Sequence, residues 1–80
     1  MTVTVLLFAS YADVLGRGSL SLDLASGATV RDALREIQSM PGAERLPMQP
    51  LVAVNERYAR VDRVLADGDA LAVIPPVAGG

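Results

Sequence analysis

The stretch LADGDALAVIPPVAGG, residues 65–80, predicts a turn, a strand and an extended end. Asp67-Gly68-Asp69 is a turn signal, because aspartate and glycine both favour tight turns. The apolar run from Ala70 to Ile74 predicts a strand, and Pro75-Pro76 ends it because proline offers a sheet no backbone N–H. This strand has to pair with segments that come earlier in the chain.

Two earlier segments have the patterns of such partners. Thr2 to Phe8 is rich in β-branched residues and predicts a central strand, buried on both faces because Leu6 and Phe8 fall on the threonine side. Ser19 to Leu24 alternates polar and apolar residues, which is the period of a half-buried strand with its leucines facing the core. We expect a loop between the two segments and an antiparallel pairing, since sequential strands usually pair.

One helix is predicted after the second strand. Thr29 is placed to cap it, and Asp32, three residues later, can accept the reciprocal hydrogen bond of a capping box. Pro41-Gly42 ends the helix after about three turns. The apolar residues that recur at helical spacing and form its buried face are Val30, Ala33, Leu34, Ile37 and Met40.

The remaining segments complete a sheet. Residues 43–50 predict an irregular connection, and Leu51 to Val54 predicts a short buried strand that ends at Asn55-Glu56. Residues 57–66 allow a helix or a short edge strand, and we favour the strand followed by a turn. A mixed sheet with one main helix packed on one face is an α+β fold of two layers. A ferredoxin-like fold is the weaker alternative, because it needs a second full helix from residues 57–66.

The composition limits the chemistry that side chains can provide. The 80 residues include no Cys, His or Lys, which excludes disulfides, thiolate nucleophiles, zinc or iron–sulfur ligation and any dyad that uses His or Lys. We therefore expect no metal site and no bound cofactor. The net charge is −2 and the arginines are scattered among acidic residues, so nucleic acid is not an expected partner.

The same composition indicates a surface that binds protein. Hydrophobic residues make up 51% of the chain, which is more than the core of so small a domain can hide. An exposed apolar face, and hence a partner, is expected. No internal run is long enough to cross a bilayer and no basic, apolar leader is present, so we expect a soluble cytoplasmic protein without membrane contact.

Three further motifs have ordinary structural explanations. Asp67-Gly68-Asp69 lacks the additional oxygen ligands of a calcium loop, so a turn is predicted there. Arg57, Arg60 and Arg63 could form a basic strip for an acidic partner, but acidic residues lie among them, and a solvated, partly self-paired edge is favoured. The sequence offers no base to activate the hydroxyl groups of Ser10, Tyr11 and Ser19, so we expect no catalytic role for them.

The end of the chain is the strongest functional signal. Its prolines predict a domain over residues 1–74 and a stiff, extended tail over residues 75–80, which could reach about 20 Å. Gly79 and Gly80 lack Cβ atoms, so they could thread a narrow channel and leave the terminal carbonyl open to attack. A carboxylate is a poor electrophile, and chemistry at Gly80 therefore needs prior activation, most simply as an acyl-adenylate with AMP as leaving group.

These motifs together resemble the small, sulfur-carrying subunits of molybdopterin synthase, a ubiquitin-like family of β-grasp fold. The most specific part of the resemblance is Leu65 to Asp69 with Ile74 to Gly80. Sulfur carriers of the thiazole pathway share the Asp-Gly-Asp turn and the Gly-Gly end but usually lack the Pro-Pro-Val that leads to it. The other matching segments are Leu6-Leu7-Phe8-Ala9 leading to Gly16, Ala28-Thr29-Val30 with Leu34, and Ala53-Val54-Asn55.

The resemblance implies a non-catalytic, sulfur-donating subunit that works through its C-terminus. An E1-like adenylyltransferase would activate Gly80 with ATP, and a sulfur donor would convert it to a thiocarboxylate. The large subunit of molybdopterin synthase would use that sulfur to build the dithiolene of molybdopterin, within a heterotetramer. The residues implied to thread into its active site are Pro75, Pro76, Val77, Ala78 and Gly79. Phe8 and Ile74 are implied at the interface with the large subunit, although a core position for Phe8 is an equal alternative.

Two other functions stay open. The first is sulfur donation to thiamine thiazole synthesis. The second is a ubiquitin-like modifier or interaction module that carries no sulfur. The absence of Lys argues weakly against a modifier that forms chains, because the protein could not be extended through its own lysine side chains.

Overall fold

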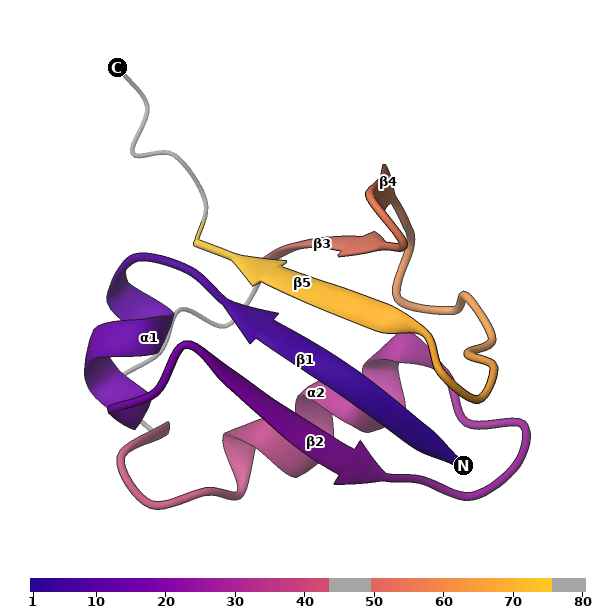
Figure 1. Cartoon of the computed structure of the whole chain (residues 1–80), viewed down its shortest axis with the longest axis horizontal. Coiled ribbons are helices and arrows are strands. Elements are labelled where there is room, and N and C mark those ends of the chain that lie inside the picture. Colours follow the sequence, from indigo (N-terminus) through magenta and orange to yellow (C-terminus); the bar gives the residue numbers. More distant parts are fainter. Residues whose placement is uncertain (44–49, 76–80) are drawn as a thin grey trace.

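The strands predicted from the sequence pattern assemble into one five-stranded sheet, with one helix across one of its faces (Figure 1). The computed structural model describes residues 1–43 and 50–75. The predicted α+β class and the predicted order of the strands are confirmed. The elements in chain order are β1 (Thr2–Leu7), α1 (Ser10–Leu15), β2 (Ser19–Asp23), α2 (Val30–Gln38), β3 (Leu51–Val54), β4 (Arg57–Tyr58) and β5 (Ala70–Ile74).

The sheet is mixed and has the strand order β2-β1-β5-β3-β4. The predicted antiparallel pairing of β1 with β2 is confirmed, and β5 lies parallel to β1 on one side and antiparallel to β3 on the other. β1 is thus an interior strand, as expected, but the middle position belongs to β5. This topology, with α2 crossing one face, is the ubiquitin-like β-grasp fold.

The region that could have made a second helix forms an edge strand and a turn. β4 pairs with the end of β3 through Ala53 and Tyr58, and Val64 makes an isolated bridge to Thr29 beside the start of α2. The preference for strand and turn over residues 57–66 is confirmed, and the ferredoxin-like alternative is wrong.

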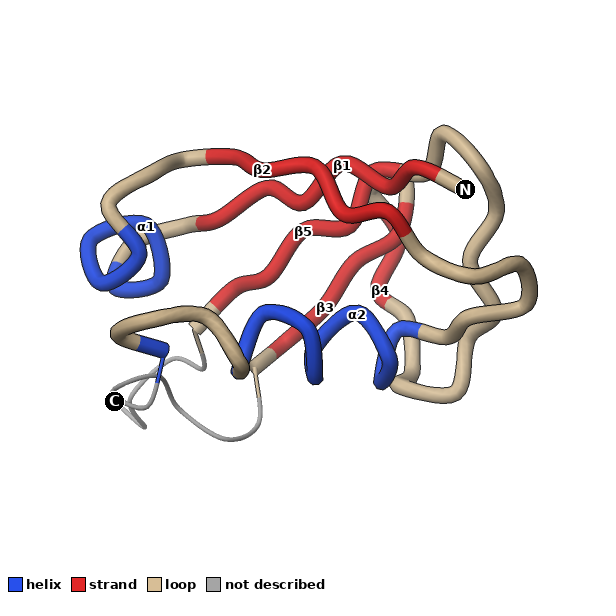
Figure 2. The backbone as a smooth tube through the Cα atoms, turned by 90° about the horizontal axis from the view of Figure 1, so that it is seen from below, coloured by secondary structure: helices blue, strands red, loops and turns tan. Residues whose placement is uncertain are grey.

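Helix α2 begins at the predicted capping box. The Thr29 backbone N–H donates to Asp32 Oδ2 at 2.9 Å, and the Asp32 N–H donates to Thr29 Oγ1 at 3.4 Å. The helix packs on one face of the sheet (Figure 2) and buries Val30, Ala33, Leu34 and Ile37 against it. Met40, predicted for the same face, is half-buried. Neither helix in residues 1–43 and 50–75 has the length and apolar character to span a bilayer.

The core lies between the sheet and α2. β1, β2, β3 and β5 contribute their inward side chains, and the alternation predicted for β2 is confirmed because Leu20, Leu22 and the following Leu24 are buried. The sheet residues of the core are Val3, Val5, Leu7, Leu20, Leu22, Val52, Val54, Leu71 and Val73. The expectation that β1 is buried on both faces is wrong, because Thr2, Thr4 and Leu6 are exposed on the face away from α2.

A short helix, α1, replaces the loop expected between the first two strands. It spans Ser10–Leu15 and ends at Gly16, whose φ of 72° lies in the left-handed region that glycine adopts without strain. Tyr11 is its anchor, with 2% of its surface exposed. Burial of this one aromatic ring against the core compensates for the lack of a side-chain cap at Ala9.

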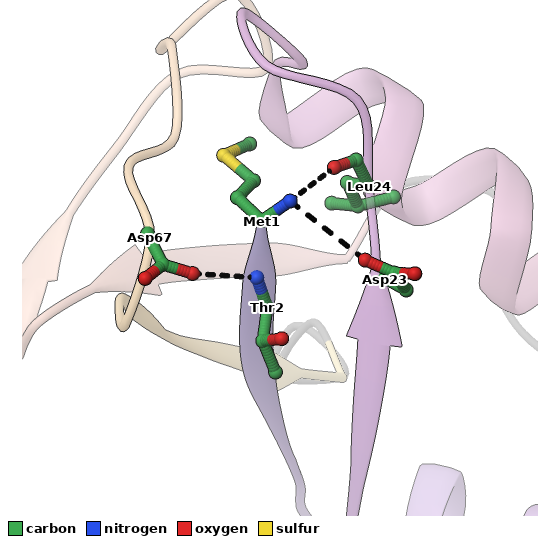
Figure 3. A network of polar contacts seen from close by, with 5 residues as sticks. All are labelled: Met1, Thr2, Asp23, Leu24 and Asp67. Atoms are coloured by element: carbon green, nitrogen blue, oxygen red, sulfur yellow. Dashed lines mark hydrogen bonds and ion pairs between the residues drawn. The ribbon is translucent and has the colours of Figure 1, made fainter.

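The turn before β5 is tied to the start of β1 (Figure 3). The Thr2 N–H donates to Asp67 Oδ1 at 2.7 Å, and the Gly68 N–H donates to the Thr2 carbonyl at 2.8 Å. On the other side, the Met1 ammonium donates to the Leu24 carbonyl at 2.7 Å and lies 3.7 Å from Asp23 Oδ1. The contacts of Thr2 hold the register in which β5 lies parallel to β1, and those of Met1 hold β1 against the end of β2.

Candidate functional site

The face of the sheet away from α2 carries an apolar patch. Leu6 of β1 lies opposite Ala72 of β5, and Leu51 of β3 lies opposite Ile74 of β5. Phe8 comes one residue after the last β1–β5 pair and is 46% exposed. We define the apolar patch as Leu6, Phe8, Leu51, Ala72 and Ile74. Since large apolar side chains seldom gather on a solvent face without a partner, the patch is a candidate docking surface.

Tyr58 extends the apolar patch toward the β4 edge. It pairs with Ala53, and directly opposite residues share a face of the sheet, so Tyr58 lies on the same side as the patch. Its side chain is 77% exposed, the largest fraction among the exposed large hydrophobic residues of the described chain. The sequence pattern did not predict Tyr58, Leu6 or Leu51 on this surface, and their pairing register and exposure identify them.

Both residues expected at a partner interface fall on this surface. Phe8 is exposed, so its alternative position in the core is wrong, whereas Ile74 is half-buried at the end of β5. Pro75, also half-buried, is the last described residue. The other predicted tail residues lie outside the described part of the chain: Pro76, Val77, Ala78, Gly79 and Gly80.

The strand that leads to the C-terminus is well anchored. β5 has hydrogen-bonded neighbours on both sides, and the turn before it is fixed by Asp69. Asp69 Oδ2 accepts the Ala66 N–H at 2.8 Å, and Asp69 Oδ1 accepts Asn55 Nδ2 at 2.9 Å. These hydrogen bonds hold the pKa of Asp69 below its ordinary value, because they favour the ionised carboxylate.

The Asp67-Gly68-Asp69 segment is a turn, as predicted. Gly68 has a φ of 85°, which favours glycine, and both flanking carboxylates accept hydrogen bonds from the protein. Within residues 1–43 and 50–75, no group of three or more Cys, His, Asp or Glu side chains is arranged to hold a metal ion.

The hydroxyl-bearing residues noted in the sequence do not come together. Ser10 begins α1 and Ser19 begins β2, both exposed, whereas Tyr11 is buried. Burial raises the pKa of Tyr11 above its ordinary value, so its hydroxyl stays protonated at neutral pH.

The arginines at the β4 edge are not self-paired as expected. Arg57, Arg60 and Arg63 are all exposed, and no ion pair within 4.0 Å joins them to Glu56, Asp62 or any other residue that the structure describes. The self-pairing part of that expectation is wrong. Arg63 nevertheless lies near enough to Asp69 to help lower the pKa of that carboxyl group.

The chain matches a known protein family and relatives that share one name. The sequence pattern of the ThiS family matches residues 5–80. The chain is 34% identical over 79 residues to the molybdopterin synthase sulfur carrier subunit of Arabidopsis thaliana, covering 98% of this chain and 82% of the relative. It is also 34% identical over 83 residues to the subunit of the same name from Chlamydomonas reinhardtii, covering 100% of both chains.

A solved structure supports the fold independently. The crystal structure of small archaeal modifier protein 1 from Haloferax volcanii superposes with a TM-score of 0.84 at 30% identity, covering 95% of this chain and 98% of that one. A protein called a modifier and proteins called sulfur carriers therefore share this architecture.

Proposed function

The chain belongs to the ThiS family of sulfur carriers, and from this premise we propose that it is the sulfur-carrying small subunit of a molybdopterin synthase. The proposal is supported by relatives of that name, which align with nearly the whole chain. The sulfur would be held at the carboxyl group of Gly80, since the sequence contains no cysteine to carry it.

The structural observation that carries the proposal is the position of β5. This strand is the middle of the sheet, its residue Ile74 belongs to the apolar patch, and the sequence continues from there to Gly79-Gly80. A partner that covers the patch would therefore lie next to the point where the tail begins. One surface would thereby serve both for docking and for delivery of the terminal glycine.

The chemistry at Gly80 would run in two steps on partner enzymes. On an E1-like adenylyltransferase, the carboxylate attacks the α-phosphorus of ATP and pyrophosphate leaves. A sulfur donor at the oxidation level of hydrosulfide then attacks the acyl carbon, and AMP leaves as the thiocarboxylate forms. In the large subunit of the synthase, this sulfur would be passed to the pyranopterin precursor and water would restore the carboxylate, and a second loaded carrier would supply the other sulfur of the dithiolene.

The apolar patch is proposed to dock the large subunit. Its residues lie on a face that the domain does not use for its own core, so their burial against a partner gains hydrophobic free energy without unfolding the carrier. Phe8 and Tyr58 supply large aromatic surfaces, which are enriched at the centres of protein interfaces. Chains of this kind would assemble with the large subunit as a heterotetramer.

The decisive experiment measures the intact mass of the protein after incubation with its activating enzyme, ATP and a sulfur donor. The expected result is replacement of one oxygen by sulfur, lost when Gly80 is deleted although circular dichroism stays unchanged. Molybdopterin should then form on addition of the large subunit and the precursor. An unchanged mass, or a truncated protein that still supports molybdopterin formation, would refute the proposal.

A modifier is the second candidate, favoured by the similarity to small archaeal modifier protein 1. In that case the activated terminus would appear in covalent conjugates with other proteins. A third outcome, sulfur donation to thiazole synthesis, is distinguished by pull-down: a thiazole synthase would be retained in place of the large synthase subunit.

A further inference from the structure

Strand β2 forms one edge of the sheet, and within the described part of the chain no strand lies on its far side (Figure 1). The opposite edge is short, because β4 has two residues and the chain after it is hydrogen-bonded to the start of α2. β2 has five residues in continuous register with β1, and only the last, Asp23, is charged. It therefore lacks most of the features by which proteins prevent strand addition at a sheet edge.

The hydrogen bonds between β1 and β2 identify the backbone groups that face this open edge. Met1 and Leu24 form a bonded pair, in which the Met1 ammonium donates to the Leu24 carbonyl at 2.7 Å and the Leu24 N–H donates to the Met1 carbonyl at 2.8 Å. Opposite pairs in an antiparallel ladder alternate between bonded and non-bonded. In this register, the non-bonded residues of β2 are Ser19, Ser21 and Asp23. Their backbone N–H and C=O groups therefore point away from β1.

These open groups match a second copy of the same strand. When two β2 strands lie antiparallel about a twofold axis at Ser21, each Ser21 pairs with Ser21 of the other copy, and each Ser19 pairs with Asp23. The open groups then fall at the bonded positions of the new ladder, so every open N–H and C=O group of β2 has a partner. Such an interface uses the same surface on both copies, which is the commonest arrangement in dimers.

The side chains are complementary in this register and in no neighbouring one. The Asp23 side chain is 94% exposed and would lie opposite Ser19 of the other copy, whose hydroxyl can donate to the carboxylate. Arg17, which is also exposed, comes two residues before Ser19 and so approaches the same carboxylate diagonally. An axis at Asp23 would place two carboxylates directly opposite each other, which is unfavourable. An axis at Ser19 would leave Asp23 beyond the end of the other β2.

We propose that β2 is a self-association edge, through which two copies of this chain form a dimer with one continuous sheet. β1 separates β2 from β5, so the new pairing does not cover Ile74 or Pro75 at the start of the tail. The paired strands are short, and the dimer should therefore be weak, with a dissociation constant of about 0.1 mM. This inference concerns the association of the chain with itself and does not depend on whether the chain carries sulfur.

Sedimentation equilibrium of the purified chain, from well below to well above that concentration, tests whether the dimer forms. Ser21→Pro removes the central open N–H without touching the β1–β2 ladder, because proline is tolerated in an edge strand where its nitrogen faces solvent. Ser21→Ala is the matched control, since it removes the hydroxyl and keeps the N–H. The proline variant should associate at least about tenfold more weakly than the wild type, and the alanine variant should associate like the wild type.

Two isomeric variants test the register and still decide the matter if circular dichroism shows that Ser21→Pro does not fold. S21D/D23S and S19D/D23S have the same composition and net charge. The first places two carboxylates face to face across the twofold axis, whereas the second keeps each carboxylate opposite a serine. At low salt the first should therefore associate about tenfold more weakly than the second, and high salt should reduce the difference.

Three results would overturn the inference. The first is a wild type that stays monomeric over the whole concentration range, and the second is equal association of the two isomeric variants. The third is a wild type that is monomeric alone while Ser21→Pro weakens binding to the large synthase subunit, because the open edge would then belong to that partner. None of these results bears on whether Gly80 is thiocarboxylated, so the proposed function stands or fails separately.

Discussion

The side chains of Asn55 and Asp69 hydrogen-bond to each other, with Asn55 Nδ2 2.9 Å from Asp69 Oδ1. Asn55 Oδ1 in turn accepts the Ala70 N–H at 3.0 Å, at the first residue of β5. One asparagine therefore joins the β3–β4 turn to the start of the strand that leads to the C-terminus. It does so with a φ of 50°, in a region that asparagine tolerates better than most residues.

Replacing Asn55 should separate its side-chain role from its backbone role. Asn55→Ala should lower the free energy of unfolding by about 2 kcal/mol, because it loses two hydrogen bonds and places alanine at positive φ. Asn55→Gly loses the same hydrogen bonds without that strain, so it should be less destabilising. Urea unfolding monitored by circular dichroism measures both, and equal losses would contradict a backbone contribution.

The low pKa of Asp69 predicts loss of stability in acid. Hydrogen bonds from the Ala66 amide and the Asn55 side chain lower this pKa in the folded state. A carboxyl group with a lower pKa folded than unfolded stabilises the protein above its unfolded pKa, near pH 4, and loses that contribution as the pH falls through the folded pKa.

The measurement for Asp69 is the unfolding midpoint between pH 7 and pH 2. Asp69→Asn should be less stable than the wild type at neutral pH, and the two should converge in acid. Asp32 also has a lowered pKa, from its hydrogen bonds with Thr29, and contributes in the same direction, so some acid sensitivity should survive in Asp69→Asn. A constant difference between wild type and variant across this range would contradict the assignment.

Two aspartates that contact the start of β1 should differ in how much they contribute to the free energy of unfolding. Asp67 accepts the Thr2 N–H at 2.7 Å, whereas Asp23 lies 3.7 Å from the Met1 ammonium and its side chain is 94% exposed. Asp67→Ala should cost about 1 kcal/mol of unfolding free energy, and Asp23→Ala under about 0.5 kcal/mol, because exposed ion pairs contribute little. Thermal unfolding of the two variants gives the comparison, and the reverse order would show that the ion pair dominates.

Leu7 and Phe8 are neighbours in the sequence, but Leu7 should contribute to the stability of the fold and Phe8 to the binding of a partner. Leu7 is 5% exposed in the core, and Phe8 is 46% exposed in the apolar patch. Leu7→Ala should cost about 2 to 4 kcal/mol of unfolding free energy, whereas Phe8→Ser should change stability little. Phe8→Ser should instead weaken binding to the large synthase subunit by about tenfold or more, as measured by calorimetry. Unchanged affinity would remove Phe8 from the docking surface.

Local signals predicted most of the fold. The alternation of β2, the Thr29–Asp32 capping box and the Asp67-Gly68-Asp69 turn each depend on residues close together in the sequence, and each has the expected structure. α1 escaped prediction because it is six residues long, lacks a side-chain cap and buries only Tyr11 completely. So short a segment contains too few turns for a helical period to show.

The docking surface could be predicted only in part. Leu6 of β1, and Phe8 just after it, are apolar residues on the face of the strand that points away from the core. A strand buried between two layers would also be apolar on both faces, so the sequence pattern fits either position. The distinction depends on whether another element covers that face, and that is set by the whole topology. The sequence therefore indicated an exposed apolar surface somewhere but assigned Leu6 to the interior.

The placement of β5 has a mechanical consequence. Because β1 and β5 run parallel, a force that pulls Pro75 away from the start of β1 acts along both strands and loads their hydrogen bonds together in shear. The antiparallel neighbour β3 adds a second row of bonds that must also slide. An enzyme that pulls on the C-terminal segment would therefore have to break these rows of hydrogen bonds together and not one at a time. The domain would thus stay folded through repeated cycles of loading and release.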